Sequence, residues 1–271
     1  MDQRMSRRGF LKWLGLTGGA LTGNWLLAAC TPVPLPASQA ASTDAATRTQ
    51  AATSLAPAAT LPSTASPFAL HTDVLPGTVT PGESIPLPPA RTGEAWPLMA
   101  ALLERRSSRS FRSDELPLQA IADLLWAGFG VNRPASGGRT APSAYDIQDI
   151  QIHLTTAGGV YLYLAQEHAL LVLKADDLRG LTGSQGFVAG APLNLVYVSD
   201  GARLAGFAAA DREHWPWTHA GCIAQNVSLA CAALGLAAVV RSTLDRTTLA
   251  RALDLPETHQ VLLAQTVGYP A

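Results

Sequence analysis

Apolar residues in the C-terminal two thirds of the chain recur with two periods, one typical of helices and one of strands. Spacings of three and four predict helices over residues 97–105, 117–130, 220–234 and 246–253, with a short one over 176–181. Alternation and short apolar runs predict strands over residues 150–155, 161–164, 169–173, 193–198, 237–241 and 260–267. The segment 220–234 is apolar nearly all round, so we expect a buried central helix that Gly235 terminates. Helices and hairpins follow one another without a βαβ repeat, which predicts an α+β fold.

The first thirty residues have the composition of a targeting segment rather than of a folded domain. Residues 6–12 read Ser-Arg-Arg-Gly-Phe-Leu-Lys, a weakly apolar stretch follows, and Leu-Ala-Ala-Cys ends at Cys30. The string resembles the twin-arginine export motif and the ending resembles a lipobox. We therefore expect residues 1–30 to be a twin-arginine signal peptide and Cys30 to carry lipid, which would hold the exported protein on the extracytoplasmic face of a membrane. A plain secretory leader or an uncleaved anchor is the alternative.

The next segment, residues 31–82, is rich in Ala, Thr, Ser and Pro and has no sustained hydrophobic period. Such a composition buries too little apolar surface to offset the entropy of ordering the chain. We expect a disordered linker here and one folded domain over residues 83–271.

Bulk composition argues against two classes of protein. The formal net charge is −1, so no general basic field indicates nucleic acid as a partner. Cys222 and Cys231 are nine positions apart in a predicted helix, which places them on opposite faces where they cannot bridge each other. A disulfide scaffold is therefore not expected.

The densest cluster of reactive side chains follows the first predicted helix. Residues 105–111 read Arg-Arg-Ser-Ser-Arg-Ser-Phe, with three guanidinium groups and three hydroxyls in seven positions. Clustered like charges cost free energy unless an anion neutralises them, and arginine forks and hydroxyls suit phosphate oxygens. The string predicts an anion site, although a solvated cationic helix end favoured by the helix dipole explains the same residues.

Four segments, in the same order, resemble motifs of the nitroreductase family. Residues 105–111 resemble its Arg-(Arg/His)-Ser-x-(Arg/Lys)-x-Phe opening, and residues 142–148, Pro-Ser-Ala-Tyr-Asp-Ile-Gln, its Pro-Ser-x-x-Asn-x-Gln segment. Residues 224–236 resemble its central helix and glycine stop, and residues 267–270 its Gly-Tyr-Pro ending. The resemblance implies a nitroreductase-like α+β fold: a mixed or antiparallel central sheet flanked by helices, in an intertwined homodimer with FMN at the interface.

The resemblance also implies roles for the matching residues. The residues that it implies would hold the FMN phosphate and ribityl chain are Arg105, Arg106 and Ser107. Those implied for the ring system and its polar atoms are Arg109, Pro142, Ser143, Ala144, Asp146 and Gln148. The loop after the strand at 237–241 aligns with a family segment whose backbone N–H faces the flavin ring, which adds Arg241 and Thr243. The flavin N5 would carry the chemistry, so no catalytic side chain is expected.

Two departures from the family pattern change these expectations. Asp146 stands where the family has Asn, and an ionised carboxylate donates no hydrogen bond, so Arg109 or Arg139 must neutralise it or its contact must differ. The sequence also ends at Ala271, before the basic tail that many relatives use to hold the phosphate. We expect Arg106 or Arg241 to replace that tail, or FMN to bind more weakly.

A second cluster, His-Trp-Pro-Trp-Thr-His, occupies residues 214–219. We expect Trp215 and Trp217 to form an aromatic lid over the ring and its substrate. A packed loop before the central helix is the alternative. No metal site is predicted, because few ligand-type residues accompany His214 and His219 at a useful spacing.

These features predict an extracytoplasmic FMN-dependent oxidoreductase that transfers two electrons to or from a small-molecule substrate. Residues 124–127 and 138–143 are also similar to the azoline-peptide dehydrogenase (SagB/ThcOx) branch, so oxidation of an organic or peptide substrate is an alternative. A lipoprotein that binds flavin or another planar ligand without turnover is a further one. Because nicotinamide donors are scarce outside the cytoplasm, the electron donor stays open.

Overall fold

The computed structural model describes residues 73–93 and 97–271, and all structural statements below concern these residues. The predicted signal peptide, Cys30 and residues 31–72 of the predicted linker lie outside them. No helix in the described ranges is both long enough and apolar enough to cross a membrane.

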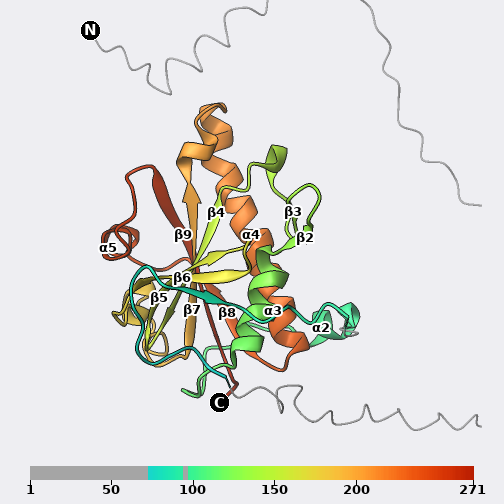
Figure 1. Ribbon diagram of the computed structural model, residues 1–271, viewed down its shortest axis with the longest axis vertical. Helices are drawn as coiled ribbons and strands as arrows, with labels where there is room; N and C mark the ends of the chain where they lie inside the picture. The colour runs from blue at the N-terminus through green and yellow to red at the C-terminus, as the bar shows by residue number, and fades with distance from the viewer. Residues whose placement is uncertain (1–72, 94–96) are drawn as a thin grey trace, which may run out of the picture. The chain divides into compact units, whose positions relative to one another are not determined.

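A seven-stranded sheet, with antiparallel pairing between all neighbouring strands, forms the centre of the domain (Figure 1). Its order is β1-β6-β5-β4-β7-β9-β8. The strands are β1 (Ser84–Pro86), β4 (Ile150–Thr156), β5 (Gly159–Leu164), β6 (Ala169–Lys174), β7 (Leu193–Asp200), β8 (Ala237–Arg241) and β9 (His259–Gly268). All six predicted strands are confirmed. β1 and the small pair β2 (Val131–Arg133) and β3 (Gly138–Arg139) were not predicted, because two or three residues are too short to show a period.

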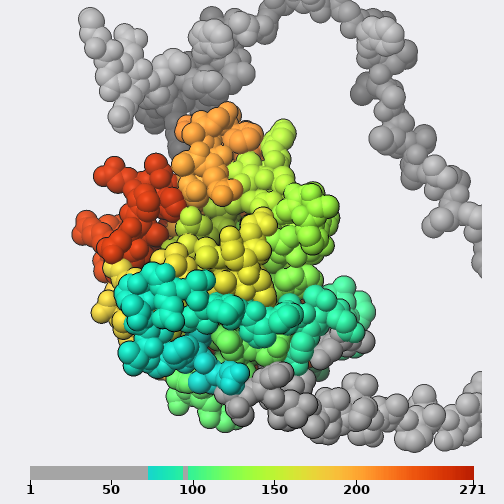
Figure 2. All heavy atoms as spheres, viewed as in Figure 1, coloured from blue at the N-terminus to red at the C-terminus, as the bar shows by residue number. Residues whose placement is uncertain are grey.

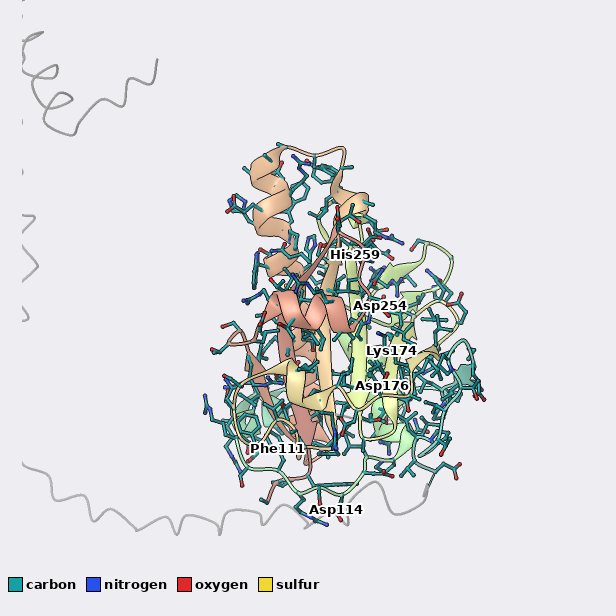
Figure 3. All side chains as sticks on the ribbon, turned by 90° about the vertical axis from the view of Figure 1, so that its left-hand side faces the viewer. Phe111, Asp114, Lys174, Asp176, Asp254 and His259 are labelled. Atoms are coloured by element: carbon teal, nitrogen blue, oxygen red, sulfur yellow. The ribbon has the colours of Figure 1, made fainter. Side chains whose placement is uncertain are left out.

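Helices cover both faces of this sheet. α3 (Leu118–Phe129) and the long α4 (Ala209–Ala233) pack side by side on one face, and α2 (Leu98–Glu104) lies near the C-terminal half of α4 (Figure 1). α5 (Arg246–Ala252) crosses the opposite face (Figure 3), where Lys174 and Asp254 form an ion pair at 2.6 Å. The mixture of helices with an antiparallel sheet confirms the predicted α+β class.

Cover on both faces explains why β7 is apolar at every position from Leu195 to Val198. Leu193, Leu195 and Tyr197 belong to the core under α3 and α4, whereas Val196 and Val198 pack with residues of α5. Alternate side chains of a strand point to opposite faces, so consecutive apolar residues suit a strand that is covered on both sides.

Helix α4 is longer than predicted, because it begins at Ala209 instead of residue 220. The aromatic cluster at 214–219 therefore lies in a helix, and the interpretation of it as a packed loop is wrong. Pro216 lies inside the helix, where it lacks the N–H for a backbone bond. The Thr218 hydroxyl donates to the carbonyl of His214, one turn earlier in the helix, at 3.2 Å. The helix end is as predicted: Gly235 has φ +69° and the Leu236 N–H donates to the Cys231 carbonyl at 2.8 Å.

The expectation that α4 is apolar and buried nearly all round is also wrong. Thr218, Gly221 and Gln225 are exposed and form one stripe along the helix, while Ile223 and Val227 face the core. Cys222 and Cys231 on this helix are both free thiols.

Two predicted boundaries need correction. The folded domain begins before residue 83, because Leu75 and Val79 belong to the main core and the Leu118 N–H donates to the Asp73 carbonyl at 2.7 Å. Figure 2 shows this segment in cyan across one face of the domain. The predicted helix at 176–181 is only a 3-10 turn at Arg179–Thr182.

His153 on β4 makes stability depend on pH. Burial lowers the pKa of His153 from 6.5 to about 4, with a smaller contribution from His259. Between these values the unfolded chain binds a proton that the folded protein does not, so the free energy of unfolding falls as the pH drops from 6.5 towards 4. The loss reaches about 3 kcal/mol near pH 4 and vanishes above pH 6.5. We predict that His153→Asn flattens this dependence in urea unfolding between pH 4.5 and 7.5. Replacing the exposed His214 by Asn should leave the parental slope unchanged, and equal slopes in all three proteins would contradict the assignment.

Candidate functional site

The arginine–serine string, residues 105–111, lies beside β8, one of the two edge strands of the sheet. Ser107 forms a parallel bridge with Ala238, whose carbonyl accepts the Ser108 N–H at 2.9 Å. Four residues later Phe111 pairs with Pro270. Backbone bonds to the sheet edge therefore hold the string in place and leave its side chains available to a ligand.

A cavity of about 250 Å³ opens beside this string. Its walls come from the string, from the C-terminal end of α4 and from β8, and include Glu104, Arg105, Arg106, Ser108, Ser228 and Ala232. Among the described residues, Arg105, Arg106 and Arg109 form no ion pair. Two cations and two hydroxyls line this cavity, with Glu104 as the one carboxylate in its wall, and such a set suits an anion. We call residues 105–109 and this cavity the phosphate half.

The other predicted stretch, residues 142–148, is tightly bonded within itself, and we call it the ring half. Ser143 Oγ accepts the Gln148 N–H at 2.8 Å, and Gln148 Nε2 donates to Asp146 Oδ1 at 2.8 Å. Arg139 Nε donates to Gln148 Oε1 at 2.8 Å. The carboxylate of Asp146 therefore accepts a hydrogen bond from an amide, which is the different contact that was one of the two expected alternatives. Arg139 bonds Gln148 and also interacts electrostatically with Asp146. Pro142 is exposed at the start of the stretch.

One chain does not bring these two halves together. Ala144 is bonded to His219 on α4, whereas the phosphate half meets α4 at Ala232, thirteen residues or about 20 Å further along the helix. In Figure 3, Phe111 and His259 lie at opposite ends of the sheet. Phe111 is the last residue of the arginine–serine string and marks its end of the sheet. His259 marks the other end: it pairs with Asp200, and the Asp200 N–H donates to the carbonyl of Asp149, which directly follows the ring half. Among four cavities lined by described residues, none is lined by residues of both predicted halves.

Comparison with known proteins identifies the family. Residues 102–269 match the sequence model of the Nitroreductase family. A solved structure from Ralstonia eutropha JMP134, named as a nitroreductase, is 41% identical, with a TM-score of 0.68 over 72% of this chain and 93% of that chain. The chain belongs to the nitroreductase family, a family of oxidoreductases.

More distant relatives agree with this. A Methanocaldococcus jannaschii protein named as a nitroreductase is 28% identical over 148 residues, which cover 51% of this chain and 74% of the relative. The Escherichia coli microcin synthetase complex contains a chain with the same fold at 22% identity and TM-score 0.57, covering 62% of this chain and 70% of that one.

Within this nitroreductase-family domain, Arg241 has a different place from the one expected. Its side chain is buried and donates to the Thr182 carbonyl, to Asn194 Oδ1 at 3.0 Å and to Thr266 Oγ1 at 3.2 Å. Burial lowers the pKa of Arg241 to about 10. A guanidinium enclosed in this way cannot replace a basic tail on the phosphate, so the Arg241 alternative is wrong, whereas Arg106 lines the cavity. Thr243, two residues on, is exposed.

The two tryptophans do not form a common lid. Trp215 contacts Phe207 and Tyr145, with ring centroids 5.1 and 5.6 Å away. Trp217 instead lies under the guanidinium of Arg246, 5.3 Å from its ring centroid. Residues two positions apart on a helix are separated by a rotation of about 200° around its axis. The two tryptophan rings therefore point to nearly opposite sides of α4 and meet different neighbours. Only Trp215 adjoins the ring half.

Sequence reasoning missed the buried polar residues that hold these segments. Asn194 and Thr266 are fully buried around Arg241, and Asp149 is fully buried next to His219. The signal was present as single polar residues in or beside apolar strands. Such residues are hydrogen-bonded when buried, but their partners lie far away in sequence.

The contacts of Arg241 predict a strong effect at Gly183. A Cβ at Gly183 would lie 1.9 Å from Arg241 Nη1, so Gly183→Ala must displace the guanidinium and break its buried bonds. We predict a loss of about 2–4 kcal/mol in the free energy of unfolding. Gly186→Ala is the matched control, because a Cβ there meets nothing within 4 Å. Equal denaturant midpoints for the two variants would show that Arg241 does not depend on this glycine.

Proposed function

We propose that this protein is an FMN-dependent oxidoreductase in which each cofactor site combines the phosphate half of one chain with the ring half of a second. The cavity beside Arg105 and Arg106 carries the proposal. Its cations form no ion pair among the described residues, and Ser108 adds a hydroxyl, which fits the dianionic phosphate of FMN. The solved relative at 41% identity supports the same chemistry through its family.

The distance between the halves within one chain supports a homodimer. Both halves adjoin α4, one near His219 and the other near Ala232, and the exposed stripe of Thr218, Gly221 and Gln225 lies beside and between them. A two-fold axis through this stripe would pair two α4 helices head to tail. That arrangement would place the N-terminal half of each α4, with its ring half, beside the phosphate half of the partner.

Bound FMN would supply two-electron transfer through N5 of its ring. The residues of this chain would bind and orient it. Arg105, Arg106 and Ser107 would hold the phosphate and ribityl chain, and Arg109 would place positive charge at the pyrimidine edge. Pro142 and Ala144 would wall the ring and exclude water from one side. None of these side chains needs to act as a nucleophile.

We further propose that the protein works outside the cytoplasm, attached to a membrane through lipid on Cys30. The leader motifs at residues 6–12 and 27–30 support this. A screen of electron donors separates the remaining alternatives: bleaching of the yellow protein by NADH or NADPH favours a reductase, and bleaching only by an organic or peptide substrate favours a dehydrogenase. A flavoprotein that no substrate bleaches would be a binding protein.

Removal of the cavity cations should remove the cofactor. We predict that Arg105→Ala with Arg106→Ala weakens FMN binding roughly 100-fold or more, because two charge-assisted hydrogen bonds are lost. The measurement is flavin absorbance of the purified protein together with FMN titration. Arg112→Ala is the matched control, since Arg112 is exposed, pairs with Asp114 at 2.8 Å and does not line the cavity. Full flavin content in the double variant would refute the phosphate assignment.

A mixed dimer tests whether the halves come from different chains. We combine a chain carrying Arg105→Ala and Arg106→Ala with a differently tagged chain carrying Pro142→Trp, which blocks the ring half. Each homodimer should lack FMN. The mixed dimer should bind about one FMN per two chains, because a two-fold dimer then has one site with both halves intact. If each site were built within one chain, the mixed dimer would bind none.

A further inference from the structure

Ala144 in the ring half is held by two buried side chains that the proposed chemistry does not use. The Ala144 N–H donates to His219 Nε2 at 2.9 Å, and His219 Nδ1 donates to Asp149 Oδ1 at 2.5 Å. Asp149 is 0% and His219 4% exposed. Within the described residues no cluster of His, Cys, Asp and Glu is arranged to hold a metal ion, so these contacts account for the histidine.

These contacts require one tautomer of His219. A carboxylate oxygen accepts, so the hydrogen must lie on Nδ1, and a backbone N–H donates, so Nε2 must present its lone pair. The neutral imidazole satisfies both partners. Neither ring nitrogen is left to exchange a proton with a substrate, which excludes a general acid or base role in this arrangement.

The sheet fixes Asp149 from its other side. Asp149 Oδ2 accepts the Ser199 hydroxyl at 2.8 Å, and the Asp149 carbonyl accepts the Asp200 N–H at 2.8 Å. A continuous series of bonds therefore runs from β7 through Asp149 and His219 to Ala144. Because the side chains of Asp149, Ser199 and His219 are buried, a bond left unmade at any of them is costly.

A second contact from the same helix holds the next residue. Trp215 lies one turn before His219, and its ring contacts that of Tyr145. Tyr145 has φ +50°, a left-handed conformation that is unfavourable for a bulky side chain and persists only where its surroundings impose it. Helix α4 thus contacts two successive residues of the ring half: it accepts a hydrogen bond from Ala144, and its Trp215 meets the exposed ring of Tyr145.

We propose that Asp149 and His219 form a positioning pair that sets where residues 142–144 lie and thereby tunes how tightly the ring half binds flavin. This role rests on the proposed function. The pair acts through the Ala144 backbone and touches no cofactor atom itself.

Two substitutions of His219 separate positioning from general stability. In His219→Gln the amide oxygen reaches the place of Nε2 and still accepts the Ala144 N–H, whereas the shorter amide of His219→Asn reaches only Asp149. On the full-length protein stripped of flavin, we expect the Ala144 amide hydrogen to exchange about tenfold faster in His219→Asn than in His219→Gln. FMN should bind about tenfold more weakly in the same comparison.

His153→Asn is the matched control, because His153 is also a buried histidine but lies on β4. It should lower stability without accelerating exchange in residues 142–148. Equal exchange at Ala144 in His219→Gln and His219→Asn would overturn the proposal, since a merely structural histidine predicts no difference in that direction.

Ala144→Pro tests the same bond if His219→Asn fails to fold. It deletes the N–H donor, and Ser143 already has the extended angles, φ −141° and ψ 135°, that a residue before proline adopts. Faster exchange of the remaining amides of residues 145–148 supports the proposal, and parental exchange there overturns it. A parent protein that binds no FMN refutes the proposed function only, because exchange in the flavin-free protein still decides the positioning pair.

Discussion

Burial of one face of α4 against the sheet is the constraint on which the rest of the domain depends. Ile223 and Val227 are fully buried there, and Gln265 on β9 donates to the Ala224 carbonyl and to Ser228 Oγ at 3.1 Å. Gln265 also accepts the Tyr197 hydroxyl at 2.5 Å. The burial of apolar surface drives the packing of α4 on the sheet. The hydrogen bonds of Gln265 set the position of the helix along the sheet, because each bond forms only when donor and acceptor are correctly placed.

This fixed helix explains how two distant parts of the sequence become parts of one proposed site. The ring half is bonded near its N-terminal half and the phosphate half adjoins its C-terminal end. A rigid helix keeps the two about 20 Å apart in one chain. The same rigidity, in a head-to-tail pair, would hold the two halves at a constant distance across the interface. The domain therefore fixes the position of each half of the proposed site, and a second chain would supply the half that is missing.

Buried polar groups carry much of this precision. Arg241 and His219 are both enclosed, and each joins a loop to the sheet: Arg241 joins residue 182 to β7 and β9, and His219 joins Ala144 to Asp149. Arg241 was expected to lie at the cofactor, and no role was predicted for His219. Their partners lie between 25 and 75 positions away in sequence, and no local pattern reveals such distances. A buried cation or imidazole is tolerated only where those partners are already in place.

The sequence by itself determined the element types, the α+β class, the end of α4 at Gly235 and the identity of the two stretches proposed to bind FMN. Hydrophobic period, glycine and proline chemistry and short motifs are local properties, so they can be read along one chain. Only the tertiary structure decided that α4 continues through Pro216 to Ala209, that Leu75 and Val79 join the core, and that Arg241 is enclosed. It also decided that the two stretches lie apart within one chain. Each of these outcomes depends on packing between segments distant in sequence, which can outweigh local preference by several kcal/mol.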